Sequence, residues 1–135
     1  MRKFIIIGKP ISQKNSKRVG VRKGGKAYMY TPANVKSWHK EAFKQLTVQL
    51  EDWGNHYGDD LAPIPDKTDL DVTIVSYMDK GQSVDVDNLA GGPLDALQKA
   101  GVIANDYWIK RLCSIREKDW KNPRVEIEIE IYQGD

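Results

Sequence analysis

The chain has 135 residues, of which 40% are hydrophobic and 30% charged, with four Trp and six Tyr. These values are typical of one folded domain over residues 1–135, and they exclude a disordered chain. The longest apolar run, residues 4–7, is too short for a membrane-spanning helix or a secretory signal, so no membrane association is predicted.

The net charge of +2 conceals an uneven distribution. Residues 1–40 contain eleven Lys or Arg and no acid, whereas residues 41–135 contain ten Lys or Arg and nineteen acids. This split indicates a polyanion-binding region near the N-terminus, attached to an acidic body. A basic face that meets only solvent is the alternative.

The single cysteine, Cys113, excludes an intramolecular disulfide and a thiolate zinc cluster. A chain without disulfides fits a reducing cytoplasm. We expect Cys113 to be a small buried hydrophobe within a strand rather than a reactive thiol.

In chain order, residues 2–8 predict the first strand. Residues 9–31 predict a basic loop in which Gly24 and Gly25 mark the turn of a hairpin. A helix is predicted over about residues 32–52, with Thr31 as N-cap. Its apolar residues recur at helical spacing: Val35, Trp38, Ala42, Leu46 and Leu50. Residues 53–67 are rich in Gly, Pro and Asp and predict a loop.

The second half of the chain predicts three strands and one more helix. Residues 68–78 alternate between apolar and polar, as a half-buried strand does. A helix follows, with Asp87 as a candidate N-cap, regular turns from near Pro93 and Gly101 as its stop. Two strands close the chain, at 111–120 and 125–133. The elements predict an α/β (α+β) fold with a small mixed sheet covered by two helices.

Two closely spaced aspartates stand where the predicted strand leads into the second helix. Residues i and i+2 of an extended chain project from one face, so Asp85 and Asp87 can share a cation. Gly101 lets the chain turn back toward the start of the helix, which predicts that Asp106 joins them. Three clustered carboxylates repel one another unless one holds a proton or a divalent cation neutralises them.

A ligand set made only of oxygen favours Mg²⁺, with Mn²⁺ as a substitute, over zinc. His39 and His56 are isolated, and we expect both to be surface or packing residues. Such a cation keeps open positions for a phosphodiester oxygen and a water molecule, so metal-dependent cleavage of a nucleic acid is predicted. Tyr28, Tyr30 and Trp38 could pack or stack nearby. The basic residues expected to contact phosphates are Lys9, Lys14, Lys17, Arg18, Arg22, Lys23 and Lys26.

Other phosphate and metal chemistries find little support. If Asp85 opened an EF-hand loop, Ala90 would stand where that loop needs Gly, and Ala96 where it needs Glu. No Walker loop, nucleophile elbow or dinucleotide-binding glycine motif is present. The metal-diphosphate motif of a glycosyltransferase is a further interpretation of the aspartate pair, but it requires a nucleotide-binding domain larger than this chain.

The spaced motif D-V-D-N-L (85–89) and D-A-L-x-K-A-G-V-I-x-x-D (95–106) resembles that of the RusA-type Holliday junction resolvases. These are small dimeric endodeoxyribonucleases of bacteria and their phages. Residues 8–18, GKPISQKNSKR, are similar to the family's first strand and the loop after it. The resemblance implies a cytoplasmic enzyme of DNA recombination and repair that cuts four-way junctions to 5′-phosphate products.

Carried onto this sequence, the resemblance implies that Asp85, Asp87 and Asp106 are catalytic and bind Mg²⁺, with Asn88 shaping the same turn. Asp95 either supports the site from behind or pairs with Lys99 on the helix surface. A homodimer is implied because a four-way junction has approximate two-fold symmetry, and each subunit is expected to supply one site.

Two positions depart from the family pattern. Gly91 stands where the family usually has a lysine, and a lysine there could stabilise charge on the scissile phosphate. Lys14 or Lys80 could substitute for it. Asn105 replaces the first member of an acid pair that ends at Asp106. The alternative function is therefore a junction- or DNA-binding protein of the same fold with weak or lost catalysis.

Overall fold

A computed structural model of the chain describes residues 2–12, 18–57 and 64–134. The strands are β1 (Arg2–Ile7), β2 (Arg18–Val21), β3 (Ala27–Tyr30), β4 (Leu70–Met78), β5 (Ile109–Lys118) and β6 (Arg124–Ile131). The helices are α1 (Ala33–Tyr57) and α2 (Gly91–Lys99), with short 3₁₀ turns η1 (Val86–Leu89) and η2 (Asp106–Trp108). The predicted order of elements is confirmed.

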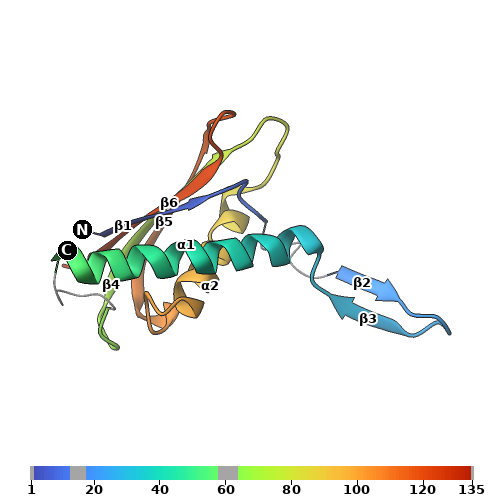
Figure 1. Cartoon of the computed structure of the whole chain (residues 1–135), viewed down its shortest axis with the longest axis horizontal. Coiled ribbons are helices and arrows are strands. Elements are labelled where there is room, and N and C mark those ends of the chain that lie inside the picture. Colours follow the sequence, from blue (N-terminus) through green and yellow to red (C-terminus); the bar gives the residue numbers. More distant parts are fainter. Residues whose placement is uncertain (1, 13–17, 58–63, 135) are drawn as a thin grey trace.

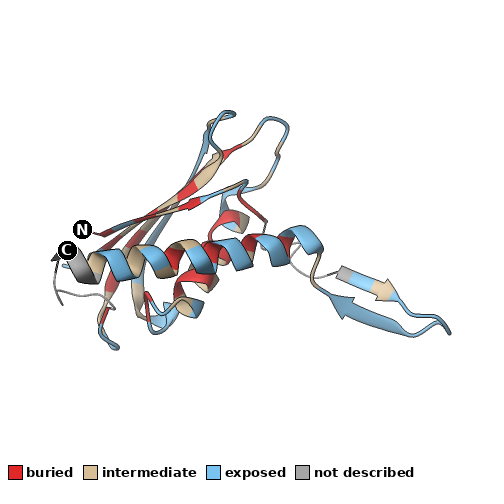
Figure 2. Ribbon diagram, viewed as in Figure 1, coloured by how far each residue is buried: buried red, intermediate tan, exposed pale blue. Residues whose placement is uncertain are grey.

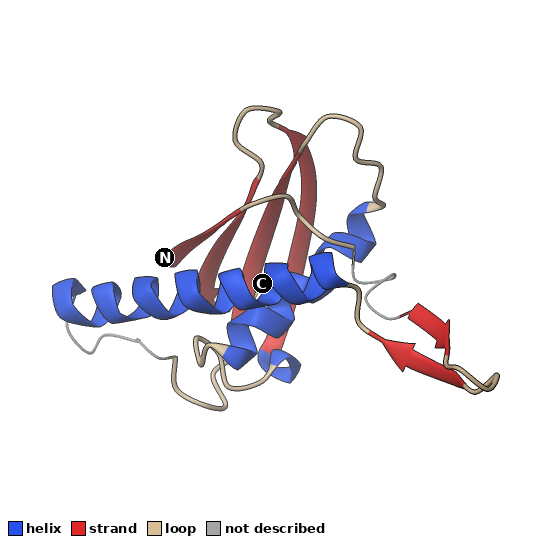
Figure 3. Ribbon diagram, turned by 45° about the vertical axis from the view of Figure 1, so that its right-hand side comes forward, coloured by secondary structure: helices blue, strands red, loops and turns tan. Residues whose placement is uncertain are grey.

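The main sheet has four strands in the order β1-β6-β4-β5. Strands β4 and β5 are parallel, while β1–β6 and β6–β4 are antiparallel, so the sheet is mixed. Both helices lie on one face of this sheet, and no helix of the described residues covers the other face (Figure 3). The predicted fold class, a mixed sheet with two covering helices, is confirmed. Strands β2 and β3 form a separate hairpin.

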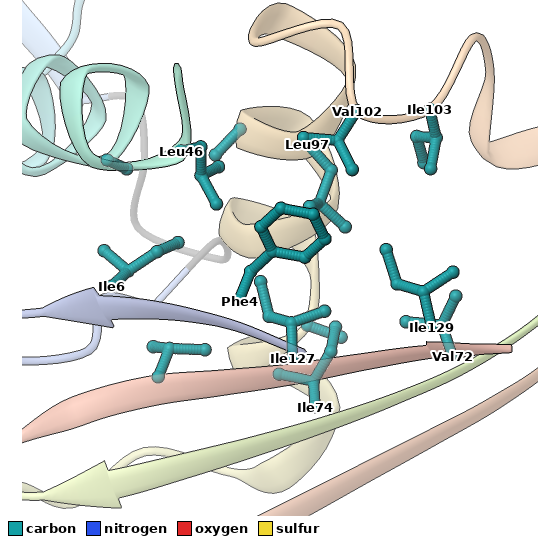
Figure 4. Packing of buried hydrophobic residues seen from close by; sticks show 14 of the residues in the cluster. Phe4, Ile6, Leu46, Val72, Ile74, Leu97, Val102, Ile103, Ile127 and Ile129 are labelled. Carbon is teal, nitrogen blue, oxygen red and sulfur yellow. The ribbon is translucent and has the colours of Figure 1, made fainter. Parts of the chain in front are cut away.

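The core lies between the sheet and the two helices. Alternate residues of β4 are buried, from Leu70 to Met78, as the period of two predicts. On α1, the predicted stripe faces the core: Val35, Trp38, Ala42 and Leu46 are buried, and Leu50 is partly buried against them (Figure 2). Figure 4 shows how side chains from β1, β4, β6 and both helices meet, among them Phe4, Ile74, Leu97 and Ile127.

Helix α2 ends in a Schellman motif. Gly101 has a φ of +78°, which only glycine adopts easily, and its N–H donates to the Gln98 carbonyl at 3.1 Å. The N–H of Val102 donates to the Leu97 carbonyl at 2.9 Å. The predicted stop at Gly101 is therefore confirmed, and the turn directs Val102 and Ile103 into the core.

Three local predictions were wrong. Helix α1 continues to Tyr57 instead of ending near residue 52, and the guanidinium of Arg2 on β1 lies 5.4 Å from the ring centroid of Trp53 in the added turn. Tertiary contact there outweighs the weak helix propensity of the Gly-Asn sequence that follows.

Cys113 is exposed, because it lies on the edge strand β5 and pairs with Thr73 on the face without helices. Helix α2 begins at Gly91, two residues before Pro93.

Two glutamines of α1 occupy the outer edge of β1. The side chain of Gln49 accepts from the Ile5 N–H at 2.8 Å and donates to the Ile5 carbonyl at 2.7 Å. Gln45 does the same for Ile7, at 2.7 and 3.2 Å. Residues i and i+4 share one helix face, so the two amides meet alternate residues of the strand. The backbone N–H and C=O groups of Ile5 and Ile7, on the edge strand β1, are therefore satisfied.

Ion pairs cross the sheet face that has no helix. Arg124 contacts Asp119 at 2.8 Å and Glu126 at 2.7 Å, and Lys3 contacts Glu126 at 2.7 Å. The hydrogen bond from Arg124 lowers the pKa of Asp119. The pKa of Glu126 is lowered mainly by the hydrogen bond from Lys3 and to a smaller extent by the one from Arg124. Carboxyl groups with a lowered pKa stabilise the fold above their ordinary pKa, and this contribution is lost as the pH falls.

We expect Arg124→Met to make stability less dependent on pH on the acid side. The wild type should lose melting temperature as the pH falls below the ordinary value of 4.5 for Glu126. The variant should melt lower than the wild type at pH 7 and lose less on acidification, since the pKa of Asp119 returns toward its ordinary value. Circular dichroism melting curves at pH 7 and pH 3 measure both effects. Parallel losses in the two proteins would contradict the expectation.

Candidate active site and nucleic-acid interface

Asp85 and Asp87 are exposed side by side where β4 leads toward α2. Asp85 is the N-cap residue of η1 in an extended conformation, and Asp87 lies within that turn. Both line an open hollow of about 520 Å³ together with Ser114, Ile115 and Arg116 of β5. The prediction that Asp87 caps the helix was wrong, because the N-cap residue of α2 is Ala90. The two carboxylates face a surface that a substrate can reach.

Side chains of β5 hold the backbone around this pair. The Ser114 hydroxyl donates to the Val86 carbonyl at 2.9 Å, and Arg116 Nη1 donates to the Val84 carbonyl at 2.8 Å. These bonds fix the residues on either side of Asp85. Ser114 and Arg116 were not among the residues predicted from the sequence. No local sequence signal identifies them, because their place beside the buried Ile74 and Ser76 depends on the parallel register of β4 and β5.

Asp106 lies at the other end of α2. Its N–H donates to Gln98 Oε1 at 3.2 Å, which places it beside the last turn of the helix. Helix α2 has nine residues, so it separates Asp106 from the carboxylate pair by about 13 Å. Strand β5 gives a similar value, since Ile109 and Ser114 are five residues, or about 16 Å, apart.

The predicted convergence of the three carboxylates within one chain is therefore not found. In the part of the chain that the structure describes, no three His, Cys, Asp or Glu side chains are close enough together to hold a metal ion. The physical reason is the turn at Gly101. It sends the chain into the core at Val102 and Ile103 instead of back along α2 to the carboxylate pair.

The residues expected around the site have mainly local roles. The Asn88 N–H donates to the Asp85 carbonyl at 3.0 Å and so closes the turn between the two aspartates. Asn105 caps η2, accepting from the Tyr107 N–H at 2.8 Å. Asp95 pairs with Lys99 at 3.6 Å on the surface of α2, in agreement with the helix-surface alternative.

The hairpin of β2 and β3 extends away from the body, beyond the first turn of α1 (Figure 1). Gly24 and Gly25 have positive φ in its turn, as the two-glycine signal predicts. Every residue of β3 is exposed, and the rings of Tyr28 and Tyr30 lie 5.7 Å apart, with the Arg22 guanidinium 5.0 Å from the Tyr28 ring. An isolated two-stranded hairpin has little stability of its own, so this one suits binding to a partner.

The predicted phosphate-contacting residues fall into three groups. Arg22, Lys23 and Lys26 are exposed at the tip of the hairpin. Lys9 forms an ion pair with Asp79 at 2.9 Å, near the loop that leads to Asp85. Lys14 and Lys17 lie outside the described residues, and Arg18 begins β2.

Of the two possible substitutes for the family lysine, Lys80 does not line the hollow that Asp85 lines. Lys14 lies outside the described residues, and the Lys80 ammonium lies 5.5 Å from the ring centroid of Trp120. The cation that lines the hollow with Asp85 and Asp87 is Arg116. His39 is half-buried and packs edge-on against Trp38, and its burial lowers its pKa.

Within the described residues, no helix is apolar over a length sufficient to cross a membrane. A search of curated proteins found no match. The family model described as Endodeoxyribonuclease RusA matches residues 8–130, which include the hairpin, both aspartates of the pair and Asp106. Members of this family are crossover junction endodeoxyribonucleases, hydrolases that act on DNA. The chain therefore belongs to the RusA family of Holliday junction-resolving endodeoxyribonucleases.

Proposed function

We propose that this protein is a Mg²⁺-dependent homodimer that resolves four-way DNA junctions by hydrolysing phosphodiester bonds in symmetric strands, in the cytoplasm of a bacterium. Asp85, Asp87 and Asp106 are the proposed catalytic residues. The observation that carries the proposal is the exposed Asp85–Asp87 pair beside Arg116, in a chain whose family cuts DNA junctions.

The donor set suits a hard divalent cation. Asp85 and Asp87 offer carboxylate oxygens, and among the residues that the structure describes no thiol or imidazole lines the hollow that they share. When bound, Mg²⁺ supplies a Lewis acid for the phosphate and a lower pKa for water, and Mn²⁺ can serve in its place. The attacking water adds its oxygen to phosphorus, the 3′-oxygen leaves, and the product strand carries a 5′-phosphate.

Arg116 is the cation proposed to act on the scissile phosphate. The family's usual lysine position is Gly91 here, so α2 offers no cation at that place. Arg116 lies across the same hollow, and its bond to the Val84 carbonyl holds it there. A guanidinium can bind two phosphate oxygens at once and stabilise the negative charge that develops on them.

A second copy of the chain would complete the carboxylate site. Asp106 lies near the first residue of β5, and the carboxylate pair lies near Ser114, farther along the same strand. A two-fold axis crossing β5 between these points reverses the strand, so Asp106 of the second copy approaches Asp85 and Asp87 of the first. Each site then contains residues of both subunits, whereas the sequence led us to expect that a single subunit supplies all three aspartates of a site.

The exposed surface of β5 suits this contact. It is an edge strand, and it exposes Leu112 by 45% and Ile115 by 36%. Large apolar side chains on a sheet edge favour pairing with another chain. The edge of β1, in contrast, is occupied by the amides of Gln45 and Gln49.

The proposal is tested with a synthetic four-way junction incubated with the pure protein over a range of Mg²⁺ concentrations. Symmetric nicks with 5′-phosphate ends are expected, and they should disappear when EDTA removes the metal. Asp87→Asn should lower the nicking rate by more than about 100-fold, since even outer partners of metal ligands typically contribute 10–100-fold. Asp95→Asn, on the surface of α2, is the matched control and should cut normally.

Binding without any nicking, unchanged by Mg²⁺ or Mn²⁺, would instead favour the second candidate, a junction-binding member of the family without catalysis. The absence of the family lysine at Gly91 is the observation that favours this candidate. The variant Gly91→Lys then tests whether the missing lysine is the cause. If the lack of this lysine alone prevents catalysis, the variant should gain nicking activity.

A further inference from the structure

Trp120 lies in an unusually exposed position for a tryptophan. It stands in the connection between β5 and β6, and 56% of its surface is exposed. This connection and the one after β4 project together beyond the same end of the sheet (Figure 1). The Asp119 N–H donates to the Met78 carbonyl at 3.1 Å and joins the two segments. Tryptophan is usually largely buried, so a ring held in solvent at a fixed place indicates a binding surface.

The ring borders a hollow of about 530 Å³. Residues from both connections and from the end of β5 line it, among them Asp79, Gln82, Arg116, Lys118 and Trp120. The Lys80 ammonium lies 5.5 Å from the centroid of the Trp120 ring, within the range of a cation–π interaction. The hollow therefore combines a flat aromatic face with nearby positive charge.

The charge of this region is positive once its ion pairs are counted. Asp79 is paired with Lys9 at 2.9 Å, and Asp119 is paired with Arg124 at 2.8 Å. In this region of the described chain, the charged groups left without an ion pair are Lys80, Arg116, Lys118 and Lys121 on the basic side, and Glu117 on the acidic side. Such a balance attracts a phosphate-bearing ligand.

Arg116 joins this hollow to the carboxylate pair. It lines both the hollow beside Trp120 and the one that contains Asp85 and Asp87. Its guanidinium bonds the carbonyl of Val84, which directly precedes Asp85. A strand whose phosphate reaches the aspartates can therefore continue past Arg116 to Trp120.

We propose that Trp120 and Lys80 bind one unpaired nucleobase and its phosphate next to the cleaved bond, an inference that rests on the proposed DNA-cleaving function. The indole stacks on the base, while Lys80 and Lys118 contact the backbone. Stacking of this kind tolerates any base and requires only that the base leaves its helix. Bases at a branch point do so at lower cost than bases within a duplex, so the site favours branched over linear DNA.

The test measures binding in an Asp87→Asn background, which prevents cutting. The probe is a four-way junction with 2-aminopurine at the branch point, whose fluorescence changes on stacking. Trp120→Ala should weaken junction binding about tenfold and abolish the fluorescence change, whereas Trp120→Phe should retain most of both. Affinity for a linear duplex should stay the same. Phe43→Ala removes another exposed aromatic ring, on α1, and should have no effect.

The stacking site is overturned if Trp120→Ala binds the junction as tightly as its parent with the same fluorescence change. An equal loss on duplex and junction overturns it too. Because the readout is binding, its failure is distinct from failure of the nuclease proposal. A wild type that stacks the probe base but never cuts with Mg²⁺ refutes catalysis and supports the stacking site.

Discussion

A purified heterodimer of one Asp85→Asn subunit and one Asp106→Asn subunit should nick junction DNA, although each variant alone is inactive. One of its two sites then contains both substitutions, and the other contains the intact Asp85–Asp87 pair of one subunit with the intact Asp106 of the other. We expect about half of the wild-type nicking rate per dimer, and cuts in one strand only. Coexpression with two affinity tags isolates the heterodimer, and gel analysis of end-labelled strands measures the cuts.

The result depends on where Asp106 lies relative to the other two aspartates. If all three belonged to one subunit's site, each site of the heterodimer would lack a carboxylate and no strand would be cut. A heterodimer that does not nick junction DNA would therefore refute the shared site. Leu112→Glu provides a second measurement, because a charge at the exposed centre of β5 should produce monomers in analytical ultracentrifugation and abolish cleavage without unfolding the chain.

Replacing Arg22, Lys23 and Lys26 together with Ala should strongly weaken junction binding. All three side chains are exposed at the tip of the hairpin, away from the core, so folding should be unaffected. Each phosphate contact contributes about 0.9 to the slope of log affinity against log salt, so the slope should fall by about 2.7 if all three bind DNA. Binding titrations between 50 and 200 mM salt, about the range in which such contacts dominate, measure this change.

The matched control replaces three exposed lysines elsewhere, Lys36, Lys40 and Lys44 on α1. These residues change the net charge by the same amount, so they should leave the salt slope nearly unaltered if the hairpin contacts DNA specifically. Equal effects of the two triple variants would show that the hairpin contributes only general positive charge.

Most of the fold follows from short-range patterns. Alternation over residues 70–78 and the helical spacing from Val35 to Leu46 each predict an element and its buried face, and both faces pack as predicted. Gly101 ends its helix because a positive φ there is a local requirement. The end of α1 could not be predicted, since it depends on a contact between Trp53 and the distant Arg2.

The site was less predictable because its parts meet through tertiary structure. The spacing of Asp85 and Asp87 predicts a pair, and the pair is found. The location of Asp106 depends on whether the chain leaves Gly101 toward the core or along the helix, and local spacing does not decide between them. Arg116 and Ser114 reach the pair through the parallel register of β4 and β5, which no local motif encodes.

In the proposed dimer, the glutamine bonds along β1 would limit how many copies can assemble. Two subunits joined through β5 would form a combined sheet with a β1 strand at each outer border, where Gln45 and Gln49 already bond Ile7 and Ile5. We therefore expect assembly by strand pairing to stop at two copies instead of continuing into a fibre. A closed pair of this kind matches the two strands that must be cut for a crossover to separate into two duplexes.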